Sequence, residues 1–595
     1  MGRGAGRSAT RERRDDGSIS EIPACSAPRL TAGSASLVLL VASLIMLALL
    51  AYVGRWLTFW SDEWDWIFRR PDPSVQSLLG GSDVHLHLFP VLIYQSLFRL
   101  VGLTWYYPYL IVSWTLHLAC VWLLFAITGR LAGWGFGLVA GLSLLFLGSG
   151  FEVLLQPGQM GYTLAEATGL LALLLLLRSG AAERAWLSRA GAAVALCVAV
   201  ASSGVGMFFV GLIILWAGLR RDWPSLAAAL PAFVLFSVWF PIFSRRTTAR
   251  LDWTLPDLLQ VPGYVAYGIG AAVTAVAGLP PYRFAVAGIA IAAVAVVLVR
   301  WLGGRFDALA LAALAALAAE FILVAGFRPS FGIGWTARSG YLHPAAALLW
   351  LVAAAVWADH RFRLRSWLRP WMVTALLIVA ILGNMAQFTG AARGMRVLRA
   401  NEIAYLRLIE ALRDSPDLDR DALGIFRISP RKYLATIDRF GAPRLVSGEP
   451  TLADLGPVDR ARLDEALVKL VGPGIRAVAR SSIAGDPPSV AVARGVAEPA
   501  GPGCVRVVAG EAPATGTWTP GTSAVTLEAG TPTAVRAVRV GVFAGPAQVI
   551  ESARAAARDA GAALRLPALP AGLRWTIQIE VVARGVVTVC SAVAA

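Results

Sequence analysis

The sequence predicts a mainly α-helical, polytopic transmembrane bundle of about eleven spans, followed by a C-terminal extracytoplasmic α+β domain that is rich in β-strands. Three observations predict this fold class. First, 57% of the 595 residues are hydrophobic and only 15% are charged, which is too apolar for a single soluble globule. Second, long apolar runs recur along the chain as far as residue 389. Third, Pro, Gly and charged residues become frequent after this point, and no later run is long enough to cross a bilayer.

The first element, residues 1–32, is expected to be a disordered basic tail on the cytoplasmic side of the membrane. It carries Arg3, Arg7, Arg11, Arg13 and Arg14 among many small polar residues. A cleaved signal peptide fits poorly, because this leader is too long and the apolar run behind it is long enough to stay in the bilayer as an anchor.

The transmembrane bundle is expected to cover residues 33–389. Its candidate spans are residues 33–54, 106–128, 132–149, 160–178, 187–203, 205–219, 225–243, 284–302, 306–326, 343–357 and 371–389. An odd number of crossings puts the N-terminus and the C-terminal domain on opposite faces. The basic loops agree with this count, because all of them then fall on the N-terminal side: Arg130, residues 178–189, Arg220, Arg221, residues 300–305 and residues 361–369.

Two further apolar stretches, residues 84–103 and 261–279, are expected not to cross the membrane. If the first crossed, the basic loops from Arg130 to Arg221 would move outside, and if the second crossed, residues 361–369 would do so. We therefore interpret both as juxtamembrane or re-entrant segments on the outer face. The first of them belongs to a long outer loop, residues 55–105.

The C-terminal domain is expected to cover residues 390–595. Helical periodicity in residues 392–413 predicts a connecting helix, and a second helix is expected at 548–560. Runs rich in Val, Thr and Ile predict strands at residues 523–527, 535–543, 575–582 and 586–589. If this domain lies outside the cell, Cys504 and Cys590 are the two cysteines that can form a disulfide.

The formal charge of +16 does not indicate nucleic-acid binding in this chain. The arginines gather between apolar runs, where the positive-inside bias of membrane proteins explains them. We therefore expect membrane lipids, and no nucleic acid, among the partners.

A candidate catalytic site follows the first span, where Asp62, Glu63 and Asp65 alternate with tryptophans that include Trp64. Carboxylates at a membrane surface can accept a proton from an attacking hydroxyl, and indole rings favour the interface and stack on sugars. The alternative is an aromatic belt with solvated acids.

Histidines and buried acids leave further alternatives open. His85 and His87, near three carboxylates, raise the possibility of a divalent metal, although a His-x-His pair is common by chance and no metal or other cofactor is assigned. His117 is expected to be a packed core residue. Glu166 and Glu320 lie inside spans, where they either face an outer cavity or form hydrogen bonds that fix helix packing.

The order of these features resembles the glycosyltransferase C superfamily, which includes protein O-mannosyltransferases and lipid A aminoarabinose transferases. The Asp-Glu pair follows the first span. Residues 85–94, His-Leu-His-Leu-Phe-Pro-Val-Leu-Ile-Tyr, and residues 98–102, Phe-Arg-Leu-Val-Gly, are similar to the family's His-Pro-Pro-Leu-x-Tyr and Leu-Phe-Gly pattern, with one proline in place of two. Residues 338–344, Arg-Ser-Gly-Tyr-Leu-His-Pro, resemble its Arg-Tyr-x-x-Pro segment. A soluble outer domain follows the bundle, as in many members.

The resemblance implies roles for particular residues. Asp62 is the candidate general base, with Glu63 and Asp65 as further candidates. Arg338 is the candidate for binding a lipid-linked phosphate, with Arg328, Arg245 and Arg246 as substitutes; the alternative role of Arg338 is an anchor to lipid headgroups. Residues 151–159 resemble a loop of uncharacterised actinobacterial membrane proteins. The remaining candidate substrate-binding residues are Tyr341, His85, His87, Glu152, Gln156, Gln159 and Trp64.

We therefore expect a membrane glycosyltransferase that moves a hexosyl or pentosyl group from a polyprenyl-phosphate donor to a glycan, lipid or protein acceptor. The reaction would take place on the outer face of the cytoplasmic membrane. No nucleotide-binding loop is visible in the sequence, which fits a lipid-linked donor. The alternatives are a transporter or flippase that uses Glu166 and Glu320 as ion sites, and a non-enzymatic envelope scaffold.

Overall fold

The structure is a computed structural model that describes residues 31–81, 85–179, 184–244, 254–301, 307–364, 370–423, 428–446, 457–472, 474–477, 489–520, 524–531, 534–545, 548–549, 562–569 and 573–592. All but the last two residues of the expected basic tail lie outside this part of the chain, as do Arg245 and Arg246.

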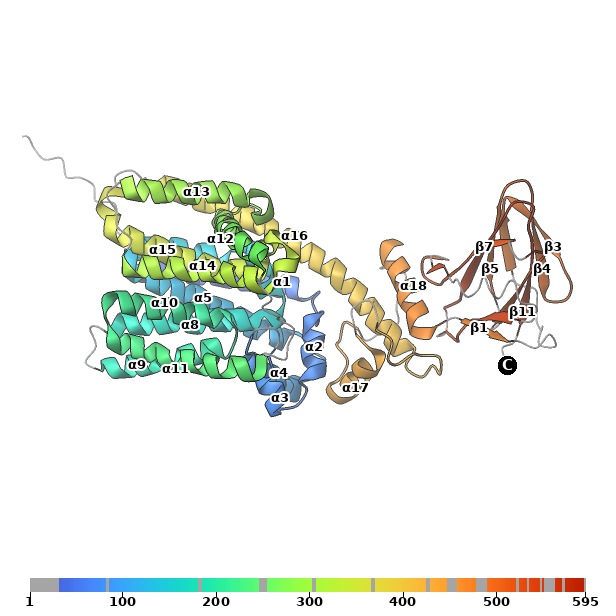
Figure 1. Cartoon of the computed structure of the whole chain (residues 1–595), viewed down its shortest axis with the longest axis horizontal. Coiled ribbons are helices and arrows are strands. Elements are labelled where there is room, and N and C mark those ends of the chain that lie inside the picture. Colours follow the sequence, from blue (N-terminus) through green and yellow to red (C-terminus); the bar gives the residue numbers. More distant parts are fainter. Residues whose placement is uncertain are drawn as a thin grey trace, which may run out of the picture.

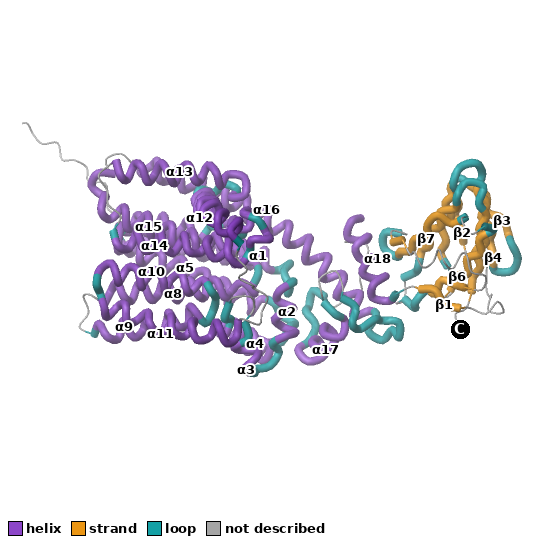
Figure 2. The backbone as a smooth tube through the Cα atoms, in the orientation of Figure 1, coloured by secondary structure: helices purple, strands orange, loops and turns teal. Residues whose placement is uncertain are grey.

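Long helices form a bundle from the first two thirds of the chain, and the strands gather at its C-terminal end (Figures 1 and 2). The long helices are α1 (Ala32–Gly54), α5 (Tyr107–Ala132), α6 (Trp134–Leu145), α8 (Met160–Ser179), α9 (Ala185–Val200), α10 (Val205–Arg220), α11 (Trp223–Trp239), α12 (Leu255–Val276), α13 (Pro281–Trp301), α14 (Ala308–Phe327), α15 (Ser339–Leu364) and α16 (Pro370–Ala411). A mainly helical, polytopic bundle with a β-rich C-terminal domain is therefore the fold, as predicted.

Each of the eleven predicted spans coincides with a helix, namely α1, α5, α6, α8, α9, α10, α11, α13, α14, α15 and α16. By length and composition alone, eight helices in the described part of the chain are long and apolar enough to cross a membrane, or nine if the bent pair Trp134–Leu145 and Gly148–Leu155 forms one span. One of the eight is α12, which the sequence places on the outer face. In Figure 1 α12 is foreshortened at the end of the bundle, whereas most of the other helices run lengthwise. That α12 does not cross stays a prediction.

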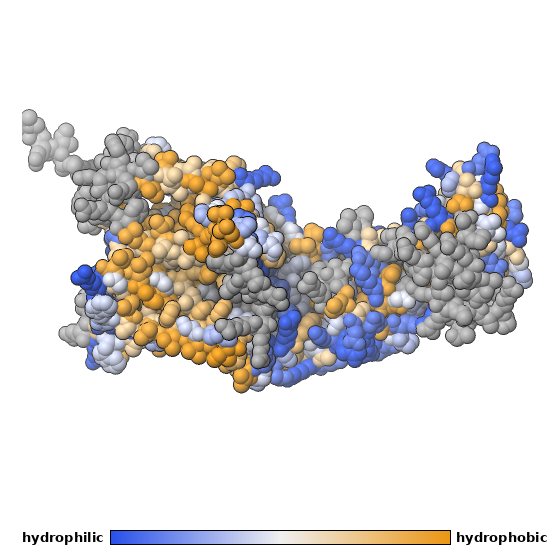
Figure 3. Space-filling view, in the orientation of Figure 1, coloured by the Kyte–Doolittle hydropathy of each residue, from blue (hydrophilic) through white to orange (hydrophobic). Residues whose placement is uncertain are grey.

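The outer surface of the bundle is apolar, as a lipid-facing surface must be. On α1 a stripe that includes Ala35, Leu39 and Met46 is fully buried, while Leu37 and Ile45 on the other side are about 60% exposed. Figure 3 shows hydrophobic residues over the side of the bundle and hydrophilic residues where the outer segments begin. This division is what the change of composition after residue 389 predicts.

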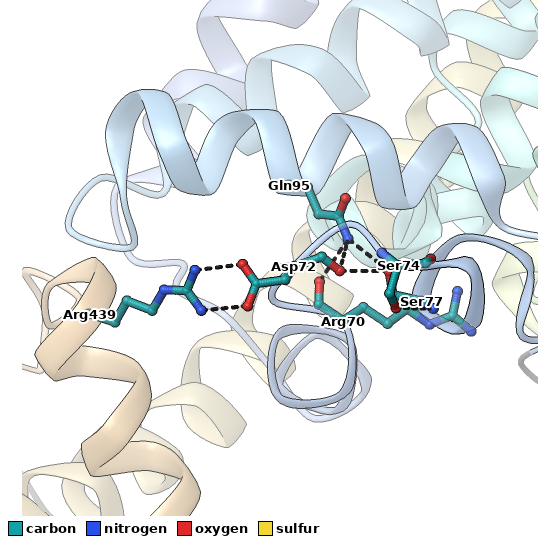
Figure 4. Close-up of polar contacts among 6 residues, drawn as sticks. All are labelled: Arg70, Asp72, Ser74, Ser77, Gln95 and Arg439. Carbon is teal, nitrogen blue, oxygen red and sulfur yellow. Dashed lines mark hydrogen bonds and ion pairs between the residues drawn. The ribbon is translucent and has the colours of Figure 1, made fainter.

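The outer loop folds into three short helices, α2 (Asp62–Arg69), α3 (Val75–Leu79) and α4 (Leu88–Val101). Buried Gln95 of α4 holds the turn before α3, because its Nε2 donates to the carbonyl oxygens of Arg70 at 3.1 Å and Asp72 at 3.0 Å (Figure 4). The Asp72 carboxylate extends away from this turn and accepts two hydrogen bonds from Arg439, at 2.6 and 2.7 Å. The loop is thereby tied to a segment more than 300 residues later in the chain.

Helix α16 joins the bundle to the C-terminal region. It combines the predicted span 371–389 and most of the predicted connecting helix 392–413 into one helix of 42 residues, which projects beyond the bundle in Figure 1. Beyond it, α17 (Pro430–Phe440) packs against the outer loop, and Leu103 N–H donates to Phe440 O at 2.9 Å. The last helix is α18 (Pro457–Val471).

Two antiparallel sheets follow α18. One has six strands in the order β1-β9-β6-β11-β4-β3, and the other has five in the order β2-β5-β10-β7-β8. Side chains alternate between buried and partly exposed along β5 and β10, as the period of two in a strand requires. The strands are β1 (Gly474–Ala477), β2 (Ser489–Ala493), β3 (Gly495–Pro499), β4 (Cys504–Ala509), β5 (Ala514–Thr519), β6 (Ala524–Ala529), β7 (Val535–Gly541), β8 (Gln548–Val549), β9 (Ala562–Arg565), β10 (Thr576–Val581) and β11 (Val586–Ala592).

The four strands expected from the sequence correspond to β6, β7, β10 and β11. The expected helix at 548–560 is wrong at its start, because residues 548–549 pair with β7 as a strand; residues 550–560 lie outside the described part. Cys504 and Cys590 form the expected disulfide, and they face each other across β4 and β11.

Candidate functional site

Helix α2 presents Asp62 and Trp66 to a cavity at the end of the bundle. The two residues are four positions apart, so they lie on the same helix face. Ser61, directly before Asp62, has φ 40° and ψ −102°, a backbone conformation that costs a non-glycine residue free energy. Residues held in this way are concentrated at functional sites, and here the strained residue lines the cavity directly before Asp62.

Glu63 lies behind the cavity wall and is almost completely buried. Its Oε1 accepts a hydrogen bond from the Tyr94 hydroxyl at 2.6 Å, and its Oε2 accepts from the Tyr106 hydroxyl at 2.9 Å and from the Trp60 N–H at 3.0 Å. Burial raises the pKa of Glu63, although the nearby Arg399 charge and these donors act in the opposite direction. Glu63 is therefore placed to hold the loop in shape, away from the space that a substrate would enter.

Asp65 and Trp64 also point away from the cavity. Asp65 forms an exposed ion pair with Arg69 at 2.6 Å. The Trp64 ring is buried between Phe68 and Tyr433, at centroid distances of 5.6 and 5.4 Å. Of the four candidates on α2, only Asp62 lines the cavity.

The opposite wall of the cavity is built around Glu152, in the short helix α7 (Phe151–Leu155), and Arg338. Arg338 Nε donates to both carboxylate oxygens of Glu152 at 3.2 Å, and the Gly340 N–H donates to Oε2 at 3.1 Å. The guanidinium also lies over the Trp335 ring, 4.7 Å from its centroid. Glu152 thus offsets the charge of Arg338 and fixes its direction, while only Nε of Arg338 contacts Glu152.

Backbone groups on the loop between α9 and α10 hold the two candidate histidines. His87 Nδ1 donates to Ser202 O at 3.1 Å, and His85 Nδ1 accepts from the Gly204 N–H at 3.0 Å. Burial holds the pKa of His87 well below its ordinary value, and the charges of His85 and Arg70 lower it further. His87 is accordingly neutral. Both histidines line the cavity.

These residues enclose a cavity of about 760 Å³, whose lining includes the carboxylates of Asp62 and Glu152 and the guanidinium groups of Arg328 and Arg338. Its lining comes from five segments far apart in the sequence: 60–66, 85–87, 151–162, 328–341 and 395–398. The cavity brings together eight of the eleven candidate residues, namely Asp62, His85, His87, Glu152, Gln156, Gln159, Arg338 and Tyr341. Glu63, Trp64 and Asp65 are the three that it leaves out.

A second, apolar slot of about 250 Å³ continues from this cavity between α10, α11 and α14. Phe208, Phe236 and Phe327 are among the side chains that line it. Four residues line both spaces and mark the junction between them: His85, Tyr162, Arg328 and Tyr341. A polar chamber thus opens into a hydrophobic passage beside a guanidinium group.

Several cavity residues were not among the candidates from the sequence. Trp60, Trp66, Tyr162 and Trp335 contribute aromatic surface, and Met395 and Leu398 come from α16. The four-residue spacing of Asp62 and Trp66 was the available signal, but it becomes informative only when the acidic segment is treated as a helix. No comparable signal pointed to α16, which reaches the cavity only because it projects beyond the bundle.

Glu166 belongs to a buried hydrogen-bonded chain inside the bundle. Its Oε2 lies 2.7 Å from His343 Nδ1, and His343 Nε2 lies 2.9 Å from His117 Nδ1. His117 Nε2 must carry a hydrogen, because it contacts the carbonyl oxygen of Leu145 at 3.3 Å. His343 Nε2 therefore donates to His117 Nδ1, and His343 Nδ1 forms a hydrogen bond with Glu166 Oε2. His117 is buried, as expected.

Glu320 lines the apolar slot and is fully buried. Within the described part of the chain neither of its carboxylate oxygens has a hydrogen-bond partner. The two intramembrane acids therefore differ, since Glu166 is held by a histidine and Glu320 faces a cavity.

No group of three or more His, Cys, Asp or Glu side chains that could hold a metal ion occurs among the residues that the structure describes. The ring nitrogens of His85 and His87 that are nearest to the α9–α10 loop are already engaged by backbone groups. The expectation that no cofactor is needed stays a prediction.

The fold and the site together define a polytopic membrane protein with an amphipathic cavity at one end of its helical bundle. Neither a protein-family model nor a curated protein sequence matches the chain. Among solved structures, the chain is similar to the crystal structure of ArnT from Cupriavidus metallidurans bound to undecaprenyl phosphate, with 16% sequence identity and a TM-score of 0.43. The match covers 68% of this chain and 85% of that one. This likeness is too distant to carry an inference about the chemistry of this chain.

Proposed function

We propose that this chain is a glycosyltransferase of the glycosyltransferase C kind, which moves a sugar from a polyprenyl-phosphate donor to an envelope acceptor. The observation that carries this proposal is the junction at Arg328, where the polar cavity meets the apolar slot. A polyprenyl-phosphate sugar has a polar sugar, a charged phosphate and a long hydrocarbon chain in that order. The cavity, Arg328 and the slot offer matching environments in the same order.

Asp62 is placed to act as the general base of this reaction. Its carboxylate would accept the proton of the acceptor hydroxyl while the acceptor oxygen bonds to the anomeric carbon. The bond between that carbon and the phosphate oxygen breaks at the same time, and polyprenyl phosphate leaves with the bonding electrons. Attack on the face opposite the leaving group inverts the anomeric carbon.

Arg328 and Arg338 would stabilise the departing phosphate. A planar guanidinium can donate two hydrogen bonds to one phosphate group, so it suits a leaving group of this kind. Arg328 lines both the polar cavity and the apolar slot, so it is the better candidate for the main phosphate contact. In this scheme Arg338 assists with the nitrogens that do not bind Glu152. The rings of Trp60, Trp66 and Trp335 offer flat surfaces for the sugar.

The C-terminal domain is proposed to lie outside the cell, on the same side as the cavity. The Cys504–Cys590 disulfide supports this orientation, because such bonds persist in oxidising compartments. α17 packs on the outer loop that carries Asp62, so the cavity faces the same side as the domain.

The test is turnover of purified protein in lipid with a panel of radiolabelled polyprenyl-phosphate sugars. Asp62→Asn should lower the rate of transfer by about 10²–10⁴-fold, the range typical of a lost general base, while donor binding is retained. Asp65→Asn is the matched control, because it removes a neighbouring carboxylate of α2 that does not line the cavity, and it should turn over at nearly the wild-type rate. Equal turnover in wild type and Asp62→Asn would exclude Asp62 as the base. No binding or turnover of any donor in the panel would exclude the transferase itself.

One observation favours a second candidate, a transporter or flippase for an amphipathic solute. Glu320 is an acid in an apolar slot and has no partner among the described residues, which is a common property of ion and proton sites in transporters. Glu320→Gln should then abolish movement of a labelled lipid across proteoliposomes. A transferase that only uses the slot to hold a hydrocarbon chain should keep its activity in this variant.

A further inference from the structure

An aromatic and cationic cluster lies where α1 meets α16, outside the cavity described above. It consists of Tyr52, Arg55, Trp56 and Arg396, and it is called the Trp56 cluster below. The Arg55 guanidinium carbon lies 3.9 Å from the Tyr52 ring centroid and 4.7 Å from that of Trp56. Arg396 approaches the same Trp56 ring at 4.2 Å. One indole ring therefore contacts two guanidinium groups from segments far apart in the sequence.

The cluster lies at the level of the lipid headgroups. Helix α1 rises about 33 Å over its 23 residues, and the 26 steps from the start of α16 to Arg396 rise about 39 Å, at 1.5 Å per residue. Both lengths exceed the roughly 30 Å of a bilayer's hydrocarbon core, so the cluster falls just beyond it. Tyr52 is 59% exposed and Trp56 is 40% exposed, as is usual for aromatic residues at the interface.

The two positive charges have no acidic partner. In the described part of the chain, neither Arg55 nor Arg396 forms an ion pair or hydrogen bond through its side chain, and both are exposed. Two like charges held against one ring repel each other, and an anion between them removes that repulsion. Arginine also forms bidentate hydrogen bonds with phosphate oxygens. An anion at the headgroup level would therefore gain charge-assisted contacts from both guanidinium groups.

We propose that the Trp56 cluster binds the phosphate group of a membrane lipid, at the lateral wall of the cavity. Its neighbours Trp60, Met395 and Leu398 line the cavity from inside, so the bound lipid would lie beside the substrate space rather than in it. The exposed side of α1 and the partly exposed Leu398 offer apolar surface for its acyl chains. This site is separate from Arg328 at the junction, and it does not require the transferase activity.

The experiment is direct lipid binding to the purified full-length chain in a neutral detergent, measured by native mass spectrometry. Phosphatidic acid is compared with a diacylglycerol of the same acyl chains, which differs only in lacking the phosphate. Wild type should bind phosphatidic acid in preference to diacylglycerol. The double variant Arg55→Gln/Arg396→Gln should bind phosphatidic acid about tenfold more weakly or worse, the effect expected from the loss of two charge-assisted contacts.

The matched control is Arg69→Gln/Arg99→Gln, which removes the same charge from the same end of the bundle without touching the Trp56 cluster. It should keep the wild-type affinity within about twofold, because exposed single charges contribute little. Arg55→Lys/Arg396→Lys keeps both charges but loses the planar groups, so its affinity should fall between the other two. Thermal unfolding of each variant shows that it is folded.

Three results would overturn the proposal. The first is equal affinity for phosphatidic acid in wild type and Arg55→Gln/Arg396→Gln. The second is a control that weakens binding as much as that variant does, since this would mean that net charge alone attracts the lipid. The third is displacement of bound phosphatidic acid by inorganic phosphate at equal concentration, which would assign the cluster to a free anion rather than to a lipid. A failure of the transferase assay leaves all of these readouts unchanged.

Discussion

Ser61 carries the most unusual backbone in the outer loop, and its position directly before Asp62 gives that strain a functional meaning. A positive φ of this kind costs about 1–3 kcal/mol in a non-glycine residue. The Ser61 side chain makes no capping hydrogen bond to the backbone of α2, and its hydroxyl donates a long hydrogen bond of 3.5 Å to Asp62 Oδ1. The strain is consistent with holding the Asp62 carboxylate toward the cavity.

Ser61→Gly should therefore stabilise the protein and slow the reaction. Glycine adopts a positive φ freely but loses more entropy on folding, so the net gain should be about 1 kcal/mol. Turnover should fall several-fold because Asp62 becomes less firmly oriented. The measurements are the thermal midpoint and the rate of sugar transfer. Ser61→Ala is the control, because it removes the hydroxyl and keeps the strain; a gain in stability in this variant would contradict the explanation.

Glu63 should make the stability of the protein depend on pH. The pKa of Glu63 is raised above 4.5 mainly by burial, so the folded state binds the proton more tightly than the unfolded chain does. Protonation of Glu63 therefore stabilises the folded state. This stabilisation is fully present below the pKa that Glu63 has in the unfolded chain, and it is lost as the pH rises through the pKa that Glu63 has in the folded protein. Glu63→Gln cannot titrate, so its thermal midpoint should fall less than that of wild type across this range.

The check is a series of thermal unfolding curves from about pH 4 to about pH 8 for wild type, Glu63→Gln and Asp65→Asn. Asp65→Asn is the control for removing a neighbouring carboxylate of α2, one that is half exposed and paired with Arg69. Parallel curves for wild type and Glu63→Gln would show that Glu63 does not titrate differently in the folded state.

At this scale the sequence identified the acidic segment but could not say which acid faces the substrate space. When residues 62–65 are treated as a loop, nothing in the sequence distinguishes the three carboxylates of Asp62, Glu63 and Asp65. As a helix they separate by direction, because Asp62 shares a face with Trp66, Glu63 turns toward Tyr94 and Tyr106, and Asp65 pairs with Arg69. The tyrosines that bind Glu63 lie 31 and 43 residues away, and no local pattern connects them to it.

Helix α16 lines part of the cavity and leads to the C-terminal region. Its Arg399 side chain contacts the segments that form the cavity wall. This side chain is completely buried, and its Nη2 donates to Leu155 O at 3.1 Å. Its Nη1 lies 4.0 Å from Glu63 Oε2. Through Glu63, Arg399 connects α16 to α2. Through Leu155, it connects α16 to α7, the short helix that carries Glu152.

Arg399→Met should cost about 3–5 kcal/mol of stability, because it leaves the buried Glu63 carboxylate without its nearby positive charge. The double variant Arg399→Met/Glu63→Gln should regain part of this loss, since the uncompensated charge is gone. The measurement is a double-mutant cycle of thermal stabilities. Additive losses would mean that Arg399 acts through its other neighbours, which include Leu155, the buried Glu402 and the aromatic rings around it, and not through Glu63.

The helices themselves were predictable, because every predicted span is a long apolar run and coincides with a helix. The joining of the span 371–389 to the helix that follows it was not predicted, since Gly390 and Gly394 weaken the helical pattern between them. The short strand at residues 548–549 was also missed. It is held by its pairing with β7, and such tertiary contacts override a local helical pattern.

At the scale of the whole molecule, the cavity and the β-sheets are separable. All five segments that line the cavity lie between residues 60 and 398. The outer loop is supported by α17, through the Asp72–Arg439 pair and the hydrogen bond between Leu103 and Phe440. Residues that follow α17 return to earlier parts of the chain at several points. The Arg444 N–H donates to Thr104 O, and Arg407 donates to Leu445 O and Val446 O. Further on, α18 packs against α16, Arg565 pairs with Asp417, and the Asp419 N–H donates to Leu470 O. In the described part of the chain, the sheets therefore contribute no residue to the cavity lining.

A chain that ends after Val446 should keep the cavity and most of its transferase activity, because it retains the bundle, α16 and α17. A chain that ends after Asp414 loses α17 as well. Trp64 then no longer packs against Tyr433, and Asp72 of the outer loop loses its ion pair with Arg439. This shorter chain should bind donor weakly and turn over slowly. The two truncations are compared with the full chain for donor binding and transfer in the same lipid. The chain that ends after Val446 could bind donor normally and yet transfer no sugar. That result would mean that the part of the chain after Val446 is required for transfer, and we would then infer that it holds the acceptor.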